Sequence, residues 1–199
     1  SDVYKRQVSL ITMDYSLYDA TVVMAKGALK SLNRILSEAE RQPNPPAFFT
    51  ARLVKDMKPL TFQVHYAIFQ AEALAARLLG REYTEPEDAL DTYDKMHARI
   101  NEALQMLEET SKDTVNRRGE TSTSFIRRNE VFQVPVKAVV GLHNMPNIYF
   151  HVAMAYAILR KEGLPLEKRD WSRPFIEEYL WAALWNIGQL NLIYFIGVS

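Results

Sequence analysis

The sequence contains no cysteine, and only four histidines and seven glycines occur among its 199 residues. Without cysteine, disulfide scaffolds, Cys-ligated zinc, iron–sulfur clusters and thiol nucleophiles are all excluded. Neither G-x-G-x-x-G nor a Walker-type G-x-x-x-x-G-K is present, so the usual nucleotide cradles lack their sequence support. A metal ion would therefore need histidine and carboxylate ligands.

Net charge is missing as well, because 24 basic side chains balance 24 acidic ones. Such a chain sets up no global field toward nucleic acid or anionic lipid, and we expect no nucleic-acid partner. The length suits one domain with a sizeable core. No basic segment followed by an apolar core lies near the start, so no secretory signal is predicted and the cytoplasm is the expected location.

The two ends of the chain differ from the middle. Residues 1–12 precede the first methionine, Met13, and are interpreted as a non-native or disordered leader. Residues 13–171 form the predicted domain. Residues 172–199 form an apolar extension of unknown role, uncharged from Tyr179 onward. Polar residues near the middle of this uncharged stretch weigh against a membrane span, so a buried or interface helix is favoured.

Apolar residues recur at alternating spacings of three and four, which is typical of amphipathic helices. A first helix is predicted over 17–42, with Ser16 and Asp19 at its start as a helix cap. A second runs from Pro59 to Gly80, a third from Pro86 to about Ser111, and a fourth from Pro146 to about Glu162. The polar side of the second helix is expected to face water; it carries Gln63, Gln70 and Arg77.

The segment between the third and fourth helices is irregular in sequence. Residues 113–130 are polar and predict a loop with at most a short β excursion around 123–126. A short helix can follow over 135–144. The predicted fold class is all-α: a four-helix bundle with an irregular excursion between helices 3 and 4.

Histidines on three helices are predicted to point inward. These are His65, His97 and His151, and Asn147 shares the inward face of the fourth helix with His151. A buried imidazole needs a hydrogen-bond partner, a charge partner or a metal. The alternative for each is a core histidine bonded to a carbonyl or a water, and Glu72 is a candidate counter-ion for His65.

Other polar residues have simpler interpretations. His143 is expected to have a structural or solvent role. The pairs 117–118 and 127–128 are both Arg-Arg and are expected to be solvated, although either could receive an anionic ligand.

Three strings carry a family resemblance: LYDATV at 17–22, ARLVKDMKPLTFQVHYA at 51–67, and MPNIYFHVAMAYAILRKEGLPLEKRDW at 145–171. They resemble the uncharacterised domain-of-unknown-function family numbered nineteen ninety-three, whose sequences often bear a helix-turn-helix label. No DNA-binding role follows from that label, because the fourth helix lacks a basic exposed face. The family is similar to the DinB/YfiT-like superfamily of four-helix bundles, which includes metal-dependent enzymes.

The resemblance implies a metal site formed by one histidine on helix 2 and an H-x-x-x-H pair on helix 4. His65 and His151 match two of these ligands, while Asn147 stands where the third would be. An amide is a much weaker ligand than imidazole for zinc or nickel. The matched site is therefore degenerate, and a divalent metal (Zn, Ni or Mn) is the only cofactor that the resemblance suggests.

Three functional hypotheses follow. The first is a small-molecule binding protein, or an enzyme of unknown reaction, that uses His65, Asn147 and His151. The second is a divalent-metal-dependent hydrolase or transferase of the DinB type, in which His97 or Glu72 replaces the lost imidazole. The third is a structural or dimerising protein without catalysis, with the apolar extension at the homodimer interface.

Overall fold

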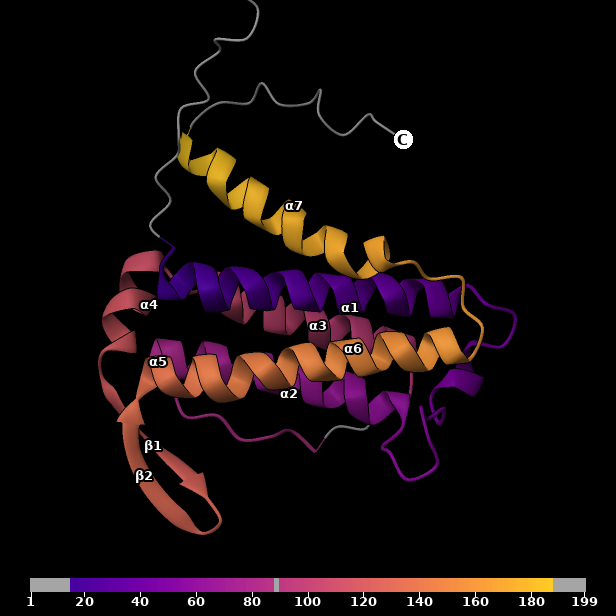
Figure 1. Cartoon of the computed structure of the whole chain (residues 1–199), viewed down its shortest axis with the longest axis horizontal. Helices are drawn as coiled ribbons and strands as arrows, with labels where there is room; N and C mark the ends of the chain where they lie inside the picture. Colours follow the sequence, from indigo (N-terminus) through magenta and orange to yellow (C-terminus); the bar gives the residue numbers. More distant parts are fainter. Residues whose placement is uncertain (1–14, 88–89, 188–199) are drawn as a thin grey trace, which may run out of the picture.

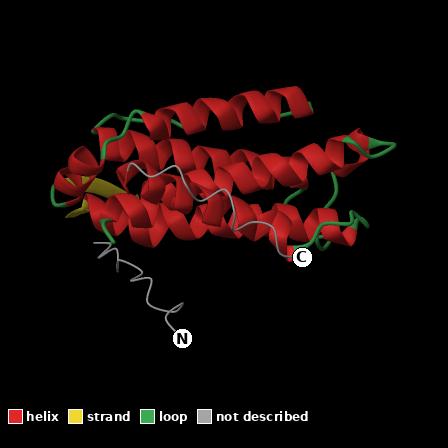
Figure 2. Cartoon of the chain, turned by 90° about the horizontal axis from the view of Figure 1, so that it is seen from above, coloured by secondary structure: helices red, strands yellow, loops and turns green. Residues whose placement is uncertain are grey.

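The computed structural model describes residues 15–87 and 90–187. The leader predicted over 1–12 and the last twelve residues of the apolar extension lie outside the described residues. Four helices form the bundle: α1 (Met24–Glu40), α2 (Leu60–Leu79), α3 (Tyr93–Glu108) and α6 (Met145–Lys161). They lie side by side along the long axis of the molecule (Figures 1 and 2). The predicted fold class is confirmed, because the chain is mainly helical with one small sheet.

The first helix begins with the predicted cap. Asp19 Oδ2 accepts hydrogen bonds from the backbone N–H and the hydroxyl of Ser16, at 2.9 and 2.7 Å. The carboxylate also suits the positive end of the helix dipole. A π-helical turn (Asp19–Val23) leads directly into α1, which ends at Glu40. The predicted helix is thus confirmed to within two residues at its end.

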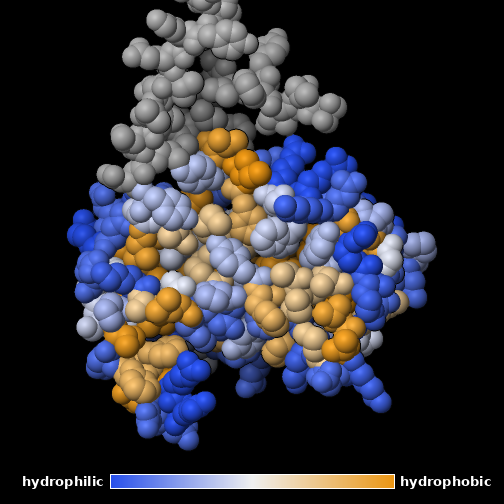
Figure 3. All heavy atoms as spheres, in the orientation of Figure 1, coloured by the Kyte–Doolittle hydropathy of each residue, from blue (hydrophilic) through white to orange (hydrophobic). Residues whose placement is uncertain are grey.

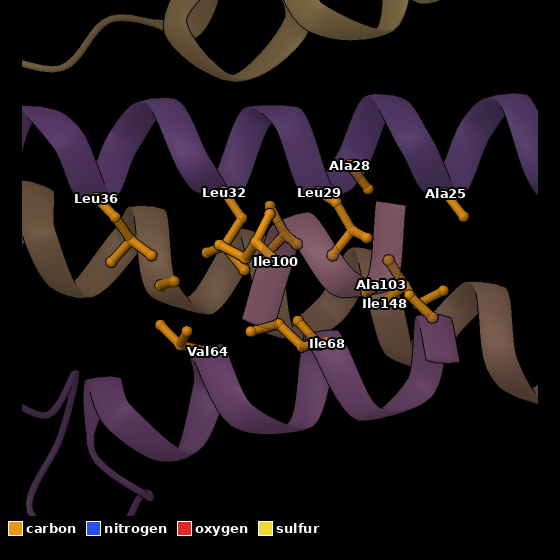
Figure 4. Close-up of a cluster of buried hydrophobic side chains, with 14 of the residues drawn as sticks. Ala25, Ala28, Leu29, Leu32, Leu36, Val64, Ile68, Ile100, Ala103 and Ile148 are labelled. Carbon is orange, nitrogen blue, oxygen red and sulfur yellow. The ribbon is translucent and has the colours of Figure 1, made fainter. Parts of the chain in front are cut away.

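The core forms where the apolar stripes of these helices meet. Figure 4 shows side chains of α1 pointing toward α2, α3 and α6, with Leu29, Leu32 and Ile100 near the centre. All three are fully buried. The second helix is bounded as predicted, since Gly80 adopts the left-handed conformation (φ +73°) that closes a helix end at little cost.

The prediction of a loop over 113–130 is wrong. Ser111 caps a short helix, α4 (Lys112–Gly119), by accepting from the N–H of Thr114 at 3.2 Å. An antiparallel hairpin follows, made of β1 (Ser122–Arg127) and β2 (Glu130–Pro135). Its two turn residues, Arg128 and Asn129, both have positive φ, as the tight hairpin turns require. The strand expected around 123–126 is therefore present, but its partner strand was not predicted.

Two predicted helix starts also need correction. The third helix begins at Tyr93 rather than near Pro86, because Thr92 supplies the cap by accepting from the N–H of Lys95. The fourth helix does not begin at Pro146. It continues from α5 (Val136–Val139) through a π-helical turn (Val140–Asn144) into α6. The widened turn lets a helix continue through a residue that has no N–H.

The prediction that the polar side of α2 faces water is wrong. Gln63 and Gln70 are each only 2% exposed, because α6 and its preceding turn pack along this side. Gln70 Oε1 accepts from the amide of Asn144 at 2.9 Å. A helical wheel identifies a polar face but not the element that covers it.

The C-terminal part of the chain forms a further helix, α7 (Lys168–Ile187), which crosses above α1 in Figure 1. Gly27 allows this close approach, since a Cβ there would lie 2.9 Å from Phe175 Cα. The Glu178 carboxylate binds Lys26 at 2.8 Å and also Lys30. Among the described residues, no helix is both long and apolar enough to cross a membrane.

Candidate functional site

The residues singled out in the sequence lie mostly on α2 and the elements packed against it. Val64 and Ile68 of α2 enter the core. A second face presents Gln63 to α6, and a third carries aromatic rings toward the surface. His65 lies between these faces and is half-buried. This arrangement separates the polar groups of α2 into two distinct networks.

The first network surrounds Arg99 of α3, a residue that the sequence analysis did not select. Its guanidinium donates to both carboxylate oxygens of Glu72, at 3.3 and 2.9 Å, and to His65 Nδ1 at 3.0 Å. Arg99 and Glu72 are only 5% and 4% exposed. The Tyr83 hydroxyl also donates to Glu72. A buried ion pair thus links the middle of α2 to α3.

These contacts set the tautomer of His65. A guanidinium can only donate hydrogen bonds, so Nδ1 of His65 must be the acceptor. Nε2 then carries the ring hydrogen and donates to Glu85 Oε1, 2.9 Å away. Both ring nitrogens are engaged by protein groups. The sequence made Glu72 a candidate counter-ion for His65. In the structure Glu72 does not bind His65 directly but is connected to it through Arg99.

The second network contains His151 and Gln63. The Gln63 side-chain amide donates to the Lys58 carbonyl at 3.0 Å, so its oxygen faces His151 Nδ1 at 2.7 Å. Nδ1 must then carry the ring hydrogen, and the lone pair of Nε2 remains for another partner. No residue in the described part of the chain bonds to this nitrogen.

Aromatic rings surround His151. The centroids of Tyr66, Phe150 and Phe62 lie 4.7, 5.1 and 6.0 Å from that of the imidazole. Burial lowers the pKa of His151 to about 4, so the ring is neutral near pH 7. Phe150 is itself 51% exposed. The result is a neutral hydrogen-bond acceptor with apolar walls at the edge of the bundle.

His65, Asn147 and His151 each have hydrogen-bond partners of their own. The Asn147 amide donates to the His143 carbonyl one helical turn earlier, at 2.7 Å. Within residues 15–87 and 90–187, no hydrogen bond joins any two members of the trio. His97 is directed elsewhere, with Nδ1 bonded to Asn33 of α1. The shared site of His65, Asn147 and His151 stays a prediction, and the hydrogen bonds that the structure gives these residues are local ones.

The donor set does not fit a metal ion. Catalytic zinc sites use about three protein ligands, whereas no group of three His, Asp or Glu side chains suited to a metal occurs in the part of the chain described here. The Arg99 guanidinium lies 3.0 Å from His65 Nδ1 and would repel a cation there. Of the two histidines that match the family's ligands, only His151 keeps a ring nitrogen, Nε2, without a hydrogen bond in the described part of the chain.

Two important residues, Arg99 and Gln63, were not predicted from the sequence to belong to the site. Arg99 lies between Met96 and Ala103 at spacings of three and four, which is the pattern of a buried stripe. A charged residue in such a stripe requires a buried partner, and this signal was available. Gln63 carried no comparable signal, because its burial depends on how α6 packs.

Comparisons with known proteins agree with this architecture. A family model described as "Domain of unknown function (DUF1993)" matches residues 17–172. A crystal structure of a DinB family member protein from Shewanella denitrificans is similar, with 31% identity and a TM-score of 0.69. The alignment covers 78% of this chain and 90% of that one. No curated protein matches the sequence.

Proposed function

The chain belongs to the DUF1993 family and is DinB-like, and from this premise we propose that it binds a small molecule without a metal ion, using His151 as the central acceptor. The ligand would be a neutral molecule with one N–H or O–H group on a flat, apolar body. Its donor would bind Nε2 of His151, and its body would contact Phe62, Tyr66 and Phe150. The protein is thus a DinB-like bundle with a degenerate metal site.

One observation carries this proposal: Gln63 holds the imidazole by Nδ1 at 2.7 Å and leaves Nε2 unpaired. Because the protein already holds this acceptor in place, the side chain does not have to be ordered when a ligand binds, and this favours binding. Binding is favoured over general-base catalysis, because a pKa of about 4 makes His151 a weak base near pH 7. We also propose a cytoplasmic setting, which suits a chain that needs no oxidising compartment to form disulfides.

The test is a titration of ¹⁵N-labelled protein with phenol, which donates a hydrogen bond, and with toluene, which has a ring but no donor. We expect phenol to shift the His151 Nε2 resonance and to bind more tightly than toluene. His151→Phe should remove this preference, whereas His97→Gln should preserve it because His97 pairs with Asn33. Equal binding of the two ligands by the parent protein would contradict the proposal.

The metal-dependent alternative is tested on the same protein. After dialysis against zinc, nickel or manganese chloride and then buffer, the bound metal is measured by elemental analysis. The proposal expects no stoichiometric metal. One metal ion per chain that is lost in His65→Ala would support the DinB-type hydrolase or transferase instead.

A dimerising role is a second candidate, and one observation favours it. Ile176 and Leu180 of α7 are 58% and 47% exposed, and their spacing of four residues places them side by side on one face of the helix. A homodimer through α7 would cover them. Light scattering of the protein with and without residues 172–199 tests this, since a dimer that survives the truncation excludes α7 from the interface.

A further inference from the structure

A cavity of about 520 Å³ lies between the hairpin and the body of the bundle, away from His151. It is lined by β1, by the last turn of α2 and by the π-helical turn that precedes α6. Six residues form its walls: Arg77, Ser124, Phe125, Ile126, Arg127 and His143. Figure 1 shows the hairpin extending from one end of the bundle.

The lining residues themselves carry positive charge and no acid. Two of the six lining residues are arginines, and none is a carboxylate. Within the described part of the chain, neither Arg77 nor Arg127 has a salt bridge. Arg77 is half-buried, and its side chain donates only to the neutral amide oxygen of Asn144, at 2.9 Å.

Electrostatic effects on the cavity residues support the same description. Burial lowers the pKa of Arg77, as expected for a guanidinium that has lost water without gaining an anion. The pKa of His143 is lowered by burial and by the charges of Arg77 and Arg127. Both guanidinium groups therefore act on the His143 ring, and an anion placed among them would relieve their repulsion.

One neutral donor and an apolar surface complete the cavity. The Ser124 hydroxyl oxygen accepts from the Gln133 amide at 2.8 Å, which leaves its hydrogen to donate elsewhere. The Phe125 ring packs against the His143 ring with centroids 5.2 Å apart. Figure 3 shows hydrophobic and strongly hydrophilic residues side by side on the hairpin end of the molecule. Such a wall can hold the apolar part of a ligand beside its charged group.

We propose that this cavity binds a small organic anion, whose carboxylate or phosphate group pairs with Arg77 and Arg127 while its apolar part rests on Phe125. Arginine suits this task because its planar fork matches both oxyanions. The volume lies within the range of small-molecule pockets. This site is independent of His151, so either proposal can fail without the other.

The experiment measures binding of benzoate, phenyl phosphate and neutral benzamide by calorimetry. We expect at least one anion to bind with an affinity that falls as salt increases, and benzamide to bind at least tenfold more weakly. A preference for benzoate or for phenyl phosphate identifies the natural ligand as a carboxylate or a phosphate. Absence of binding by both anions would overturn the proposal.

Variants then locate the site. Arg127→Gln, on the exposed strand, should weaken anion binding about tenfold to a hundredfold, the usual worth of a charge-assisted hydrogen bond. Arg77→Gln should weaken it similarly, with far-UV circular dichroism as the check on folding. The matched control is Arg117→Gln, an exposed residue of α4 outside the cavity. An equal loss in Arg117→Gln would show that only net charge matters and would overturn the proposal.

Discussion

Replacing Arg99 by methionine should lower the free energy of unfolding by about 3 to 5 kcal/mol, the usual cost of removing one partner of a buried ion pair. Methionine keeps much of the apolar volume but removes the hydrogen bonds to both Glu72 oxygens and to His65. Glu72 is only 4% exposed, so water cannot replace the lost donors. The Tyr83 hydroxyl alone would remain to stabilise the carboxylate.

The assay is urea unfolding followed by circular dichroism. The double variant Arg99→Met/Glu72→Met should be destabilised by clearly less than the sum of the two single variants, because neither charge is then left unpaired. The matched control is Lys95→Met, which removes an exposed ion pair with Asp91 at 2.6 Å and should cost less than about 1 kcal/mol. Additive single effects, or an Arg99→Met cost no larger than that of the control, would refute the reasoning.

Three further predictions concern other parts of the molecule. The pKa of His151 falls from 6.5 to about 4 on folding, so between these pH values the unfolded chain binds more protons than the folded protein. The free energy of unfolding, measured with urea, should therefore decrease as the pH falls from about 6.5 to about 4. The decrease should be less steep in His151→Gln. Gly27→Ala should destabilise the protein by about 1 to 3 kcal/mol, since its Cβ would meet Phe175 at 2.8 Å, whereas Gly141→Ala meets nothing within 4 Å and should leave the melting temperature nearly unchanged. Truncation after Trp171 removes the rest of α7 from α1 and should lower the melting temperature; an unchanged value would show that α7 adds no stability.

Much of the fold could be predicted because its signals are local. Spacings of three and four locate the bundle helices, Ser16 and Asp19 locate the first start, and Gly80 locates the end of α2. The hairpin was missed for a physical reason. Its turn puts Arg128 at positive φ, and arginine in a sequence does not indicate this conformation as glycine or asparagine would.

The candidate site was less predictable because it depends on packing between distant segments. The sequence places His65 and His151 on inner faces of two helices, which the family resemblance also implied. It does not say that Arg99, 34 residues further along, would occupy His65 Nδ1. Nor does it say that Gln63 would face α6 and hold His151. Side-chain partners of this kind are decided by tertiary contacts.

The most direct test of the account is the tautomer of each imidazole, read from long-range ¹H–¹⁵N NMR spectra of the labelled protein at neutral pH. The account predicts that His65 carries its hydrogen on Nε2, because Arg99 donates to Nδ1, and that His151 carries its hydrogen on Nδ1, because Gln63 accepts it. These patterns should persist when zinc chloride is added. Two histidines with the same tautomer, or a zinc-induced change in both rings, would contradict the claim that Arg99 and Gln63 hold these two imidazoles.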